Sequence, residues 1–167
     1  VCCNAFAYLK MAFKELTLNN FRCFKSAKIE LSPGINFFYG KNGSGKTSLL
    51  EAIHLCSSGK SFKSSNLQAL IAQGEDSFSL KSYDVDKGYI LSVTKEKNKS
   101  VAVLINNTKT TSSRLIREFP STAIHNNTFS FADASPDFRR KMLDRALFVS
   151  DRSCLLYTSD AADDTPC

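Results

Sequence analysis

The chain has 167 residues, of which 43% are hydrophobic and 11% aromatic, and it carries a net charge of +6. This composition excludes a disordered chain, and the length suits one domain or a piece of one. No apolar run has the length of a membrane span, and residues 1–10 lack the basic stretch of a secretory signal. We therefore expect a cytoplasmic protein without a membrane partner.

The natural chain is interpreted as beginning at Met11, with residues 1–10 as an upstream segment that is not native or has no structure. Residues 13–21 alternate between apolar and polar side chains, which predicts a half-buried strand. The same period returns at 27–31, after a turn at 22–25, and predicts a second strand. Two strands thus precede the most informative stretch of the sequence.

The stretch from Gly40 to Thr47 reads G-x-x-x-x-G-K-T, the pattern of a loop that cradles phosphates. Its glycines leave the backbone free to curl N–H groups around a di- or triphosphate. Lys46 is placed to reach the β- and γ-phosphates, and the Thr47 hydroxyl is placed to bind Mg²⁺. ATP and Mg²⁺ are therefore the expected cofactors. The expected nucleotide contacts are Gly40, Lys41, Asn42, Gly43, Ser44, Gly45, Lys46, Thr47 and Ser48.

The sequence on either side of the loop supports this prediction. The apolar run 35–39 predicts a short strand entering the loop, and residues 47–55 predict a helix leaving it. The apolar positions of that helix are Leu49, Leu50, Ile53 and Leu55. Its N-terminus would add partial positive charge beside the phosphates.

Beyond this helix the pattern predicts a mixture of helices and strands. A polar, basic loop at 57–65 precedes a short helix at 66–74. The later expected elements are strands at 77–83, 89–95 and 100–105, a turn at 106–109, a helix at 112–119, a strand at 121–124, and a helix at 135–149. The expected fold is therefore α/β, with a phosphate-loop core and an antiparallel β-rich subdomain at about 77–105.

Only Cys23 and Cys56 of the six cysteines lie within the body of the chain. Neither the cysteines nor the two histidines have the spacing of metal ligands. We expect Cys23 and Cys56 to be buried or half-buried free thiols in a reducing compartment.

Residues 154–167 resemble the translation of a sequencing adapter, which places the end of the natural sequence near residue 153. The natural body is then 11–153, the N-terminal part of a larger domain. One lysine lies in 1–10 and three aspartates lie in 154–167, so the body carries a net charge of +8. This basic body suits a polyanionic partner.

Four pieces of sequence occur in a characteristic order. They are Leu18-Asn19-Asn20-Phe21-Arg22, the stretch from Gly40 to Ile53, Gly59-Lys60-Ser61-Phe62-Lys63, and Ser135-Pro136 followed by Arg139-Arg140 and Leu143-Asp144. Together they resemble the N-terminal part of the RecF family of recombination-repair ATPases, which is related to SMC and ABC-type ATPases. The resemblance covers about residues 11–150 and implies the N-terminal half of a P-loop NTPase head. It also implies that Arg22 contacts a phosphate.

The resemblance further implies an ATP-dependent DNA-binding protein of recombinational DNA repair and replication, active in the SOS response to DNA damage. Such a protein is expected to form an ATP-dependent homodimer that clamps DNA where single-stranded and double-stranded segments meet, together with recombination-mediator proteins. In the family, the signature motif, the Walker B pair and the switch histidine come from the C-terminal half. We therefore expect this fragment to bind nucleotide weakly and not to hydrolyse it. Residues 125–134 depart from the family pattern, so no water-positioning residue is assigned there.

Several alternatives stay open at this point. One is another SMC-like ATPase head with a long coiled coil further along the chain. A second is a nucleotide-dependent transporter head, which predicts a Gln near 124–127 where this sequence has none. Arg22 is either a phosphate contact or a solvent-facing arginine in a turn. Lys60 and Lys63 either contact a DNA backbone or belong to a solvated basic loop.

Overall fold

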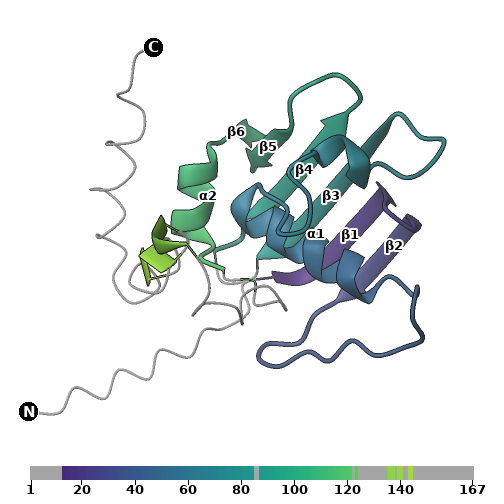
Figure 1. The fold of residues 1–167 in the computed structure, drawn as a ribbon, viewed down its shortest axis with the longest axis horizontal. Helices are drawn as coiled ribbons and strands as arrows, with labels where there is room; N and C mark the ends of the chain where they lie inside the picture. The colour runs from purple at the N-terminus through teal and green to yellow at the C-terminus, as the bar shows by residue number, and fades with distance from the viewer. Residues whose placement is uncertain are drawn as a thin grey trace, which may run out of the picture. The chain divides into compact units, whose positions relative to one another are not determined.

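The computed structural model describes residues 13–84, 87–121, 123, 135–137, 139–140 and 143–144. Within them, six strands form one antiparallel sheet in the order β2-β1-β3-β4-β5-β6 (Figure 1). The strands are β1 (Phe13–Phe21), β2 (Phe24–Glu30), β3 (Ser77–Asp84), β4 (Ile90–Glu96), β5 (Ala102–Ile105) and β6 (Thr108–Lys109). The helices are α1 (Lys46–Ser58), the 3₁₀ turn η1 (Leu67–Leu70) and α2 (Ser112–Glu118).

The alternation of side chains explains why this sheet has one buried face. In β1, Leu16 and Leu18 are buried, whereas Thr17 and Asn19 are only partly covered. The register then aligns buried and partly buried residues of neighbouring strands. One row across β2, β1, β3, β4 and β5 consists of Ala27, Leu18, Leu80, Val93 and Val103. Full burial of a large aliphatic side chain stabilises a fold by about 1.5–3 kcal/mol, so such rows fix the register.

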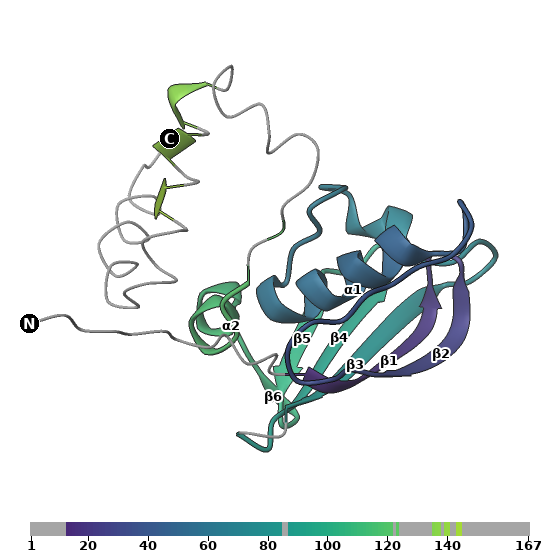
Figure 2. The same cartoon turned by 90° about the horizontal axis from the view of Figure 1, so that it is seen from below.

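Helix α1 covers the buried face of the sheet and packs against β1, β3, β4 and α2 (Figure 2). Leu49, Ala52 and Leu55 recur at helical spacing and are buried in the shared core. The helix ends at Gly59, whose φ of 69° is favourable only for glycine and whose N–H donates to the Leu55 carbonyl at 2.8 Å. The sheet thereby fixes the direction of α1 and the place of the loop before it.

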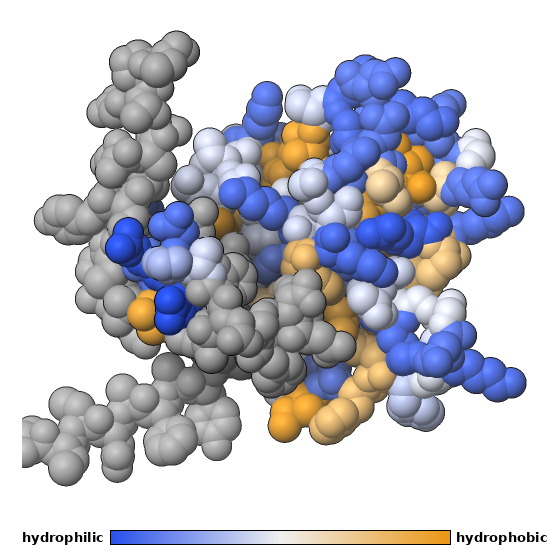
Figure 3. Space-filling model, in the orientation of Figure 1, coloured by the Kyte–Doolittle hydropathy of each residue, from blue (hydrophilic) through white to orange (hydrophobic). Residues whose placement is uncertain are grey.

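The run predicted as a strand at 35–39 is an extended loop, which corrects that prediction. Ile35, Phe37 and Tyr39 are 80%, 84% and 95% exposed. Figure 3 shows hydrophobic side chains at the lower edge of the molecule, where this loop runs in Figure 1. A strand needs a neighbour for its backbone groups, and none of the described strands pairs with this run. Apolar alternation without a partner therefore leaves an extended loop.

Other boundaries differ by local causes. Helix α1 is longer than the predicted 47–55 because it continues to the glycine cap, and Leu50 lies on its outer side, 48% exposed. The predicted helix at 66–74 is reduced to η1, because Ile71 returns to extended backbone and pairs with Phe21. The predicted turn at 106–109 contains the short strand β6.

The predicted antiparallel strands at about 77–105 are present and belong to a larger sheet. Strands β3, β4 and β5 match the expected runs closely, but β1 hydrogen-bonds directly to β3. The two N-terminal strands therefore extend the same sheet, because β1 carries an apolar face of the same period as β3.

C-terminal to Phe119 the structure describes few residues. Of the predicted strand at 121–124, only Ser121 and Ala123 are described, and neither is in a strand. The described residues between 136 and 144 are helical, as the predicted helix at 135–149 requires. The predictions for 1–10, 125–134 and 154–167 lie outside the described residues. Among the residues that are described, no helix is both long and apolar enough to cross a membrane.

Candidate phosphate-binding site

Gly45 sets the close approach between the glycine-rich loop and the turn that joins β1 to β2. It is the N-cap of α1 with a φ of 92°. A Cβ at this position would lie 2.6 Å from Cζ of Phe24 and 2.9 Å from Sγ of Cys23. Both the backbone conformation and the space therefore require glycine.

The N-terminus of α1 is open to a ligand. No side chain caps it, and its first turn contains no acidic residue. The first N–H groups of a helix have no acceptor within the helix, and the helix dipole places partial positive charge beside them. Lys46, Thr47 and Ser48 occupy this first turn. Such an end is a favourable place for a phosphate group.

A pocket of about 580 Å³ lies at this end of α1. The loop and first turn contribute Asn42, Gly43, Gly45, Lys46, Thr47 and Ser48. The β1–β2 turn contributes Arg22 and Cys23, and the segment after α1 contributes Lys63, Ala69 and Ile71. The volume falls within the range of small-molecule sites. Because Arg22, Lys46 and Lys63 are its charged lining residues, the pocket suits a polyanion.

The Lys46 side chain folds over the loop. Its Nζ donates to the carbonyl oxygens of Gly40 at 2.7 Å and Lys41 at 2.8 Å. The Ser44 N–H also donates to the Lys41 carbonyl, at 3.2 Å. These bonds hold the ammonium group close to the curled backbone, where it would stand beside a bound phosphate.

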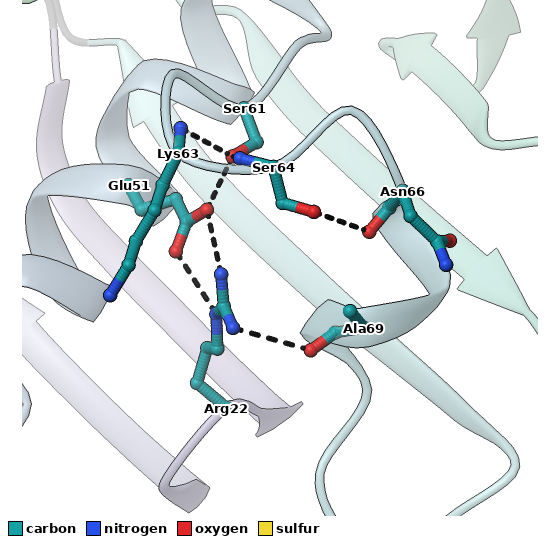
Figure 4. Close-up of polar contacts among 7 residues, drawn as sticks. All are labelled: Arg22, Glu51, Ser61, Lys63, Ser64, Asn66 and Ala69. Carbon is teal, nitrogen blue, oxygen red and sulfur yellow. Dashed lines mark hydrogen bonds and ion pairs between the residues drawn. The ribbon is translucent and has the colours of Figure 1, made fainter.

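Arg22 is held by a buried carboxylate rather than pointing to solvent (Figure 4). Its Nε donates to Oε2 of Glu51 at 3.0 Å and its Nη2 to Oε1 of Glu51 at 3.1 Å. The Glu51 side chain is 1% exposed and that of Arg22 is 24% exposed. Nη1 of Arg22 also donates to the Ala69 carbonyl at 3.4 Å. This two-point pairing orients the guanidinium at the wall of the pocket.

The loop after α1 is attached to the same carboxylate. The Ser61 hydroxyl donates a hydrogen bond to Oε1 of Glu51. Its oxygen accepts hydrogen bonds from the N–H groups of Lys63 and Ser64, each at 3.0 Å. The Phe62 ring packs edge-on against the His54 ring of α1, with centroids 5.7 Å apart. The basic loop is therefore ordered by α1, and Lys63 extends from it past Glu51 (Figure 4).

The structure distributes the residues predicted for the site into two groups. Asn42, Gly43, Gly45, Lys46, Thr47, Ser48 and Arg22 line the pocket. Gly40, Lys41 and Ser44 are not lining residues and instead shape the loop through the bonds described above. The two lysines considered for DNA contact also separate, because Lys63 lines the pocket and Lys60 does not.

Glu51, Ser61 and Cys23 also belong to this region, although the sequence pattern did not predict them as site residues. A signal for Glu51 was present, since it is the acidic residue of an otherwise apolar and uncharged run in the middle of α1. A carboxylate on a buried helix face needs a cationic or hydrogen-bonding partner. The sequence does not say which partner, because Arg22 lies 29 positions away.

The two body cysteines lie in different environments. Cys56 is buried in the core, as expected, and burial raises the pKa of its thiol to about 12. Cys23 is exposed, which corrects the expectation that it is buried or half-buried. It belongs to the tight β1–β2 turn, where its thiol faces the pocket rather than the core.

A family model described as an AAA domain matches residues 15–147. The chain therefore belongs to the AAA domain family, and its sheet, helix and glycine-rich loop are those of the N-terminal half of a P-loop NTPase head. A solved structure titled for ATP-driven dimerization and DNA-stimulated activation of SMC ATPases has a TM-score of 0.63 over 80% of this chain and 98% of that chain. At 19% identity, this similarity shows the shared fold alone.

Within that class, the chain is similar to RecF proteins. The DNA replication and repair protein RecF of Thermoanaerobacter sp. (strain X514) is 37% identical over 149 residues, covering 87% of this chain and 41% of the relative. The solved structure of the recombination mediator protein RecF-ATP in the RecFOR pathway has a TM-score of 0.72 at 29% identity, over 89% of this chain and 41% of that chain. The resemblance to the N-terminal part of RecF is thus confirmed. The chain spans about two fifths of the length of the relatives it matches.

Proposed function

We propose that this chain binds the phosphates of ATP in the pocket at the N-terminus of α1. The observation that carries the proposal is the convergence of Arg22, Lys46 and Lys63 on an uncapped helix N-terminus. These groups come from three separate segments, and each presents positive charge or N–H donors to the same space. RecF in the similar solved structure is described as bound to ATP, which agrees with the proposal.

Magnesium is the proposed second component of the site. The Thr47 hydroxyl, exposed in the first turn of α1, is the side chain that would hold it. Mg²⁺ commonly retains several waters and takes its remaining ligands from one or two protein groups and the phosphates. A single hydroxyl beside a triphosphate pocket therefore fits this ion, and Mg²⁺ would neutralise the phosphate charge.

For the whole protein we propose an ATP-dependent DNA-binding ATPase of recombinational repair and replication, working in the cytoplasm as part of the SOS response. Support comes from the 37% identity to a DNA replication and repair protein RecF. The related solved structures concern a recombination mediator of the RecFOR pathway and ATP-driven dimerization of SMC ATPases. The proposed partners are accordingly DNA at junctions of single and double strands, a second copy of the protein, and other recombination mediators.

The exposed run at 35–39 also supports the proposal that this chain is part of a larger head domain. Ile35, Phe37 and Tyr39 expose alternate apolar side chains at the entrance to the loop. Such a run pairs readily with another strand. We propose that it joins the part of the head that this chain, at 41% of its relative's length, does not span.

The two lysines of the basic loop have different proposed roles. Lys63 lines the phosphate pocket, so it is assigned to the nucleotide. Lys60 is exposed and outside the pocket, so it keeps the proposed contact with a DNA backbone.

Nucleotide binding is tested by titrating the 167-residue chain with MgATP and following backbone amide signals by NMR, a method that detects weak binding. Lys46→Ala should weaken binding about tenfold or more, because a hydrogen bond to a charged group contributes about 1.5–3 kcal/mol. Lys109→Ala, at an exposed position of β6, removes the same charge away from the pocket and should have little effect. If MgATP shifts no signals of residues 42–48, or if both variants bind like the parent, the assignment is wrong.

DNA binding is tested on the full-length protein at several salt concentrations. The basic body lacks a base-reading motif, so affinity should fall steeply with salt and depend little on sequence. A flat salt dependence, or a strong preference for one sequence, would contradict an electrostatic contact with the backbone.

A further inference from the structure

A single buried carboxylate connects the phosphate pocket to the basic loop that follows α1. Glu51 pairs with Arg22, and it also accepts a hydrogen bond from the Ser61 hydroxyl (Figure 4). We propose that Glu51 is a positioning residue that holds both Arg22 and the basic loop with Lys63 in place for a bound triphosphate. This inference rests on the proposed binding of ATP in the pocket.

The pairing does not use up the donors of Arg22. A guanidinium has five N–H groups. Two of them go to Glu51 and one to the Ala69 carbonyl. Two donors, one on each Nη atom, therefore stay available for a phosphate oxygen while the carboxylate keeps the guanidinium plane fixed. Glu51 thus orients Arg22 without removing it from the site.

The backbone of Arg22 is fixed independently of Glu51. Its φ of 55° lies in the left-handed region, and its N–H donates to the Leu70 carbonyl at 2.8 Å. The neighbouring Phe21 pairs with Ile71. The turn would therefore persist if the carboxylate were lost, and only the long side chain would become free. Ordering such a side chain costs rotamer entropy, and the pairing with Glu51 incurs that cost before the ligand arrives.

The second arm of the network acts on the loop. The Ser61 hydroxyl donates a hydrogen bond to Glu51 and accepts hydrogen bonds from the N–H groups of Lys63 and Ser64. One hydroxyl therefore joins the carboxylate to the backbone of the loop. The order of the loop around Lys63 therefore depends on the same carboxylate that orients Arg22. Because both arms meet at one group, phosphate binding and loop order should favour one another reciprocally.

The test compares Glu51→Gln with the parent chain by NMR, using MgATP as the probe. Removing a negative charge beside the pocket would by itself tighten binding of a polyanion. Loss of positioning acts in the opposite direction, and we expect it to dominate, with affinity about tenfold lower. Hydrogen exchange of the Lys63 and Ser64 amides should become faster in the same variant.

Asp84→Asn is the matched control. Like Glu51, Asp84 is only 1% exposed, but it lies beside Phe13, at the opposite end of β1 from Arg22. This variant should lose stability without losing MgATP affinity or exposing the Lys63 and Ser64 amides. Ser61→Ala separates the two arms, since it leaves the Arg22 pair intact. It should speed amide exchange while lowering affinity less than Glu51→Gln, and it serves where Glu51→Gln does not fold.

The outcomes separate the two proposals. If MgATP binds and Lys46→Ala weakens it, while Glu51→Gln binds as tightly as the parent or more tightly, Glu51 has no positioning role. The same conclusion follows if Ser61→Ala leaves the exchange of both amides unchanged. If Lys46→Ala has no effect, the nucleotide assignment itself fails.

Discussion

The two ends of α1 have opposite surroundings. At its C-terminal end, Leu55 and Cys56 are fully buried. The hydroxyls of Ser57 and Ser58 both donate to the His54 carbonyl, and Gly59 closes the helix. At its N-terminal end, an uncapped turn opens into a charged pocket.

This difference separates stability from binding within one helix. The buried end supplies apolar contact with the sheet, which fixes where the helix lies. The open end retains N–H groups that the fold itself does not satisfy. A ligand can use those groups only because the other end holds the helix still. Changes at the two ends should therefore have different consequences.

The largest expected effect comes from breaking the buried end. Leu55→Ala should lower the free energy of unfolding by about 2–5 kcal/mol, because it leaves a cavity between α1 and the sheet. Denaturant unfolding measures this loss. In the fraction that stays folded, MgATP affinity should change little. Lys46→Ala should show the reverse pattern, and a parallel loss of stability and affinity in both variants would remove the distinction between the two ends.

A smaller effect is expected from two glycines of the open end. Gly43 and Gly45 both have positive φ, of 84° and 92°. A side chain in that conformation costs about 1–2 kcal/mol. At Gly45 the new Cβ would also collide with Phe24, whereas at Gly43 it would meet no described heavy atom within 4 Å apart from its neighbours in the chain. Gly45→Ala should therefore be the more destabilising of the two in thermal unfolding, and equal losses would contradict the close packing around Gly45.

The smallest perturbation uses the cysteines as native reporters of the two ends. Alkylation at pH 8 should modify Cys23, which is exposed in the pocket, and spare Cys56, which is buried at the other end. Burial raises the pKa of the Cys56 thiol to about 12, so at pH 8 this thiol is both protonated and inaccessible to the reagent. Peptide mapping by mass spectrometry distinguishes these sites from the four terminal cysteines.

MgATP should also slow the alkylation of Cys23, because Cys23 lines the pocket in which MgATP would bind. Protection of Cys56 instead of Cys23, or equal labelling of both thiols in the folded chain, would contradict the contrast between the two ends.

Much of the local structure was determined by the sequence itself. The alternation in 13–21 specifies β1 to the residue, and the spacing of Leu49 and Leu55 specifies a buried helix face. The glycine pattern from Gly40 to Thr47 likewise predicts a strained loop leading into a helix. These features depend on neighbours along the chain, through period, backbone freedom and capping, and a sequence displays such neighbours directly.

The tertiary structure alone decided which distant residues meet. Arg22 and Glu51 lie 29 positions apart, and their pairing depends on how β1 and α1 pack. The loop at 35–39 has the period of a strand, yet pairing requires a neighbour that local pattern does not supply. Exposure of Cys23 and the place of Lys63 in the pocket have the same origin. Each depends on contacts across space, where burial and partner geometry, rather than residue type, determine the outcome.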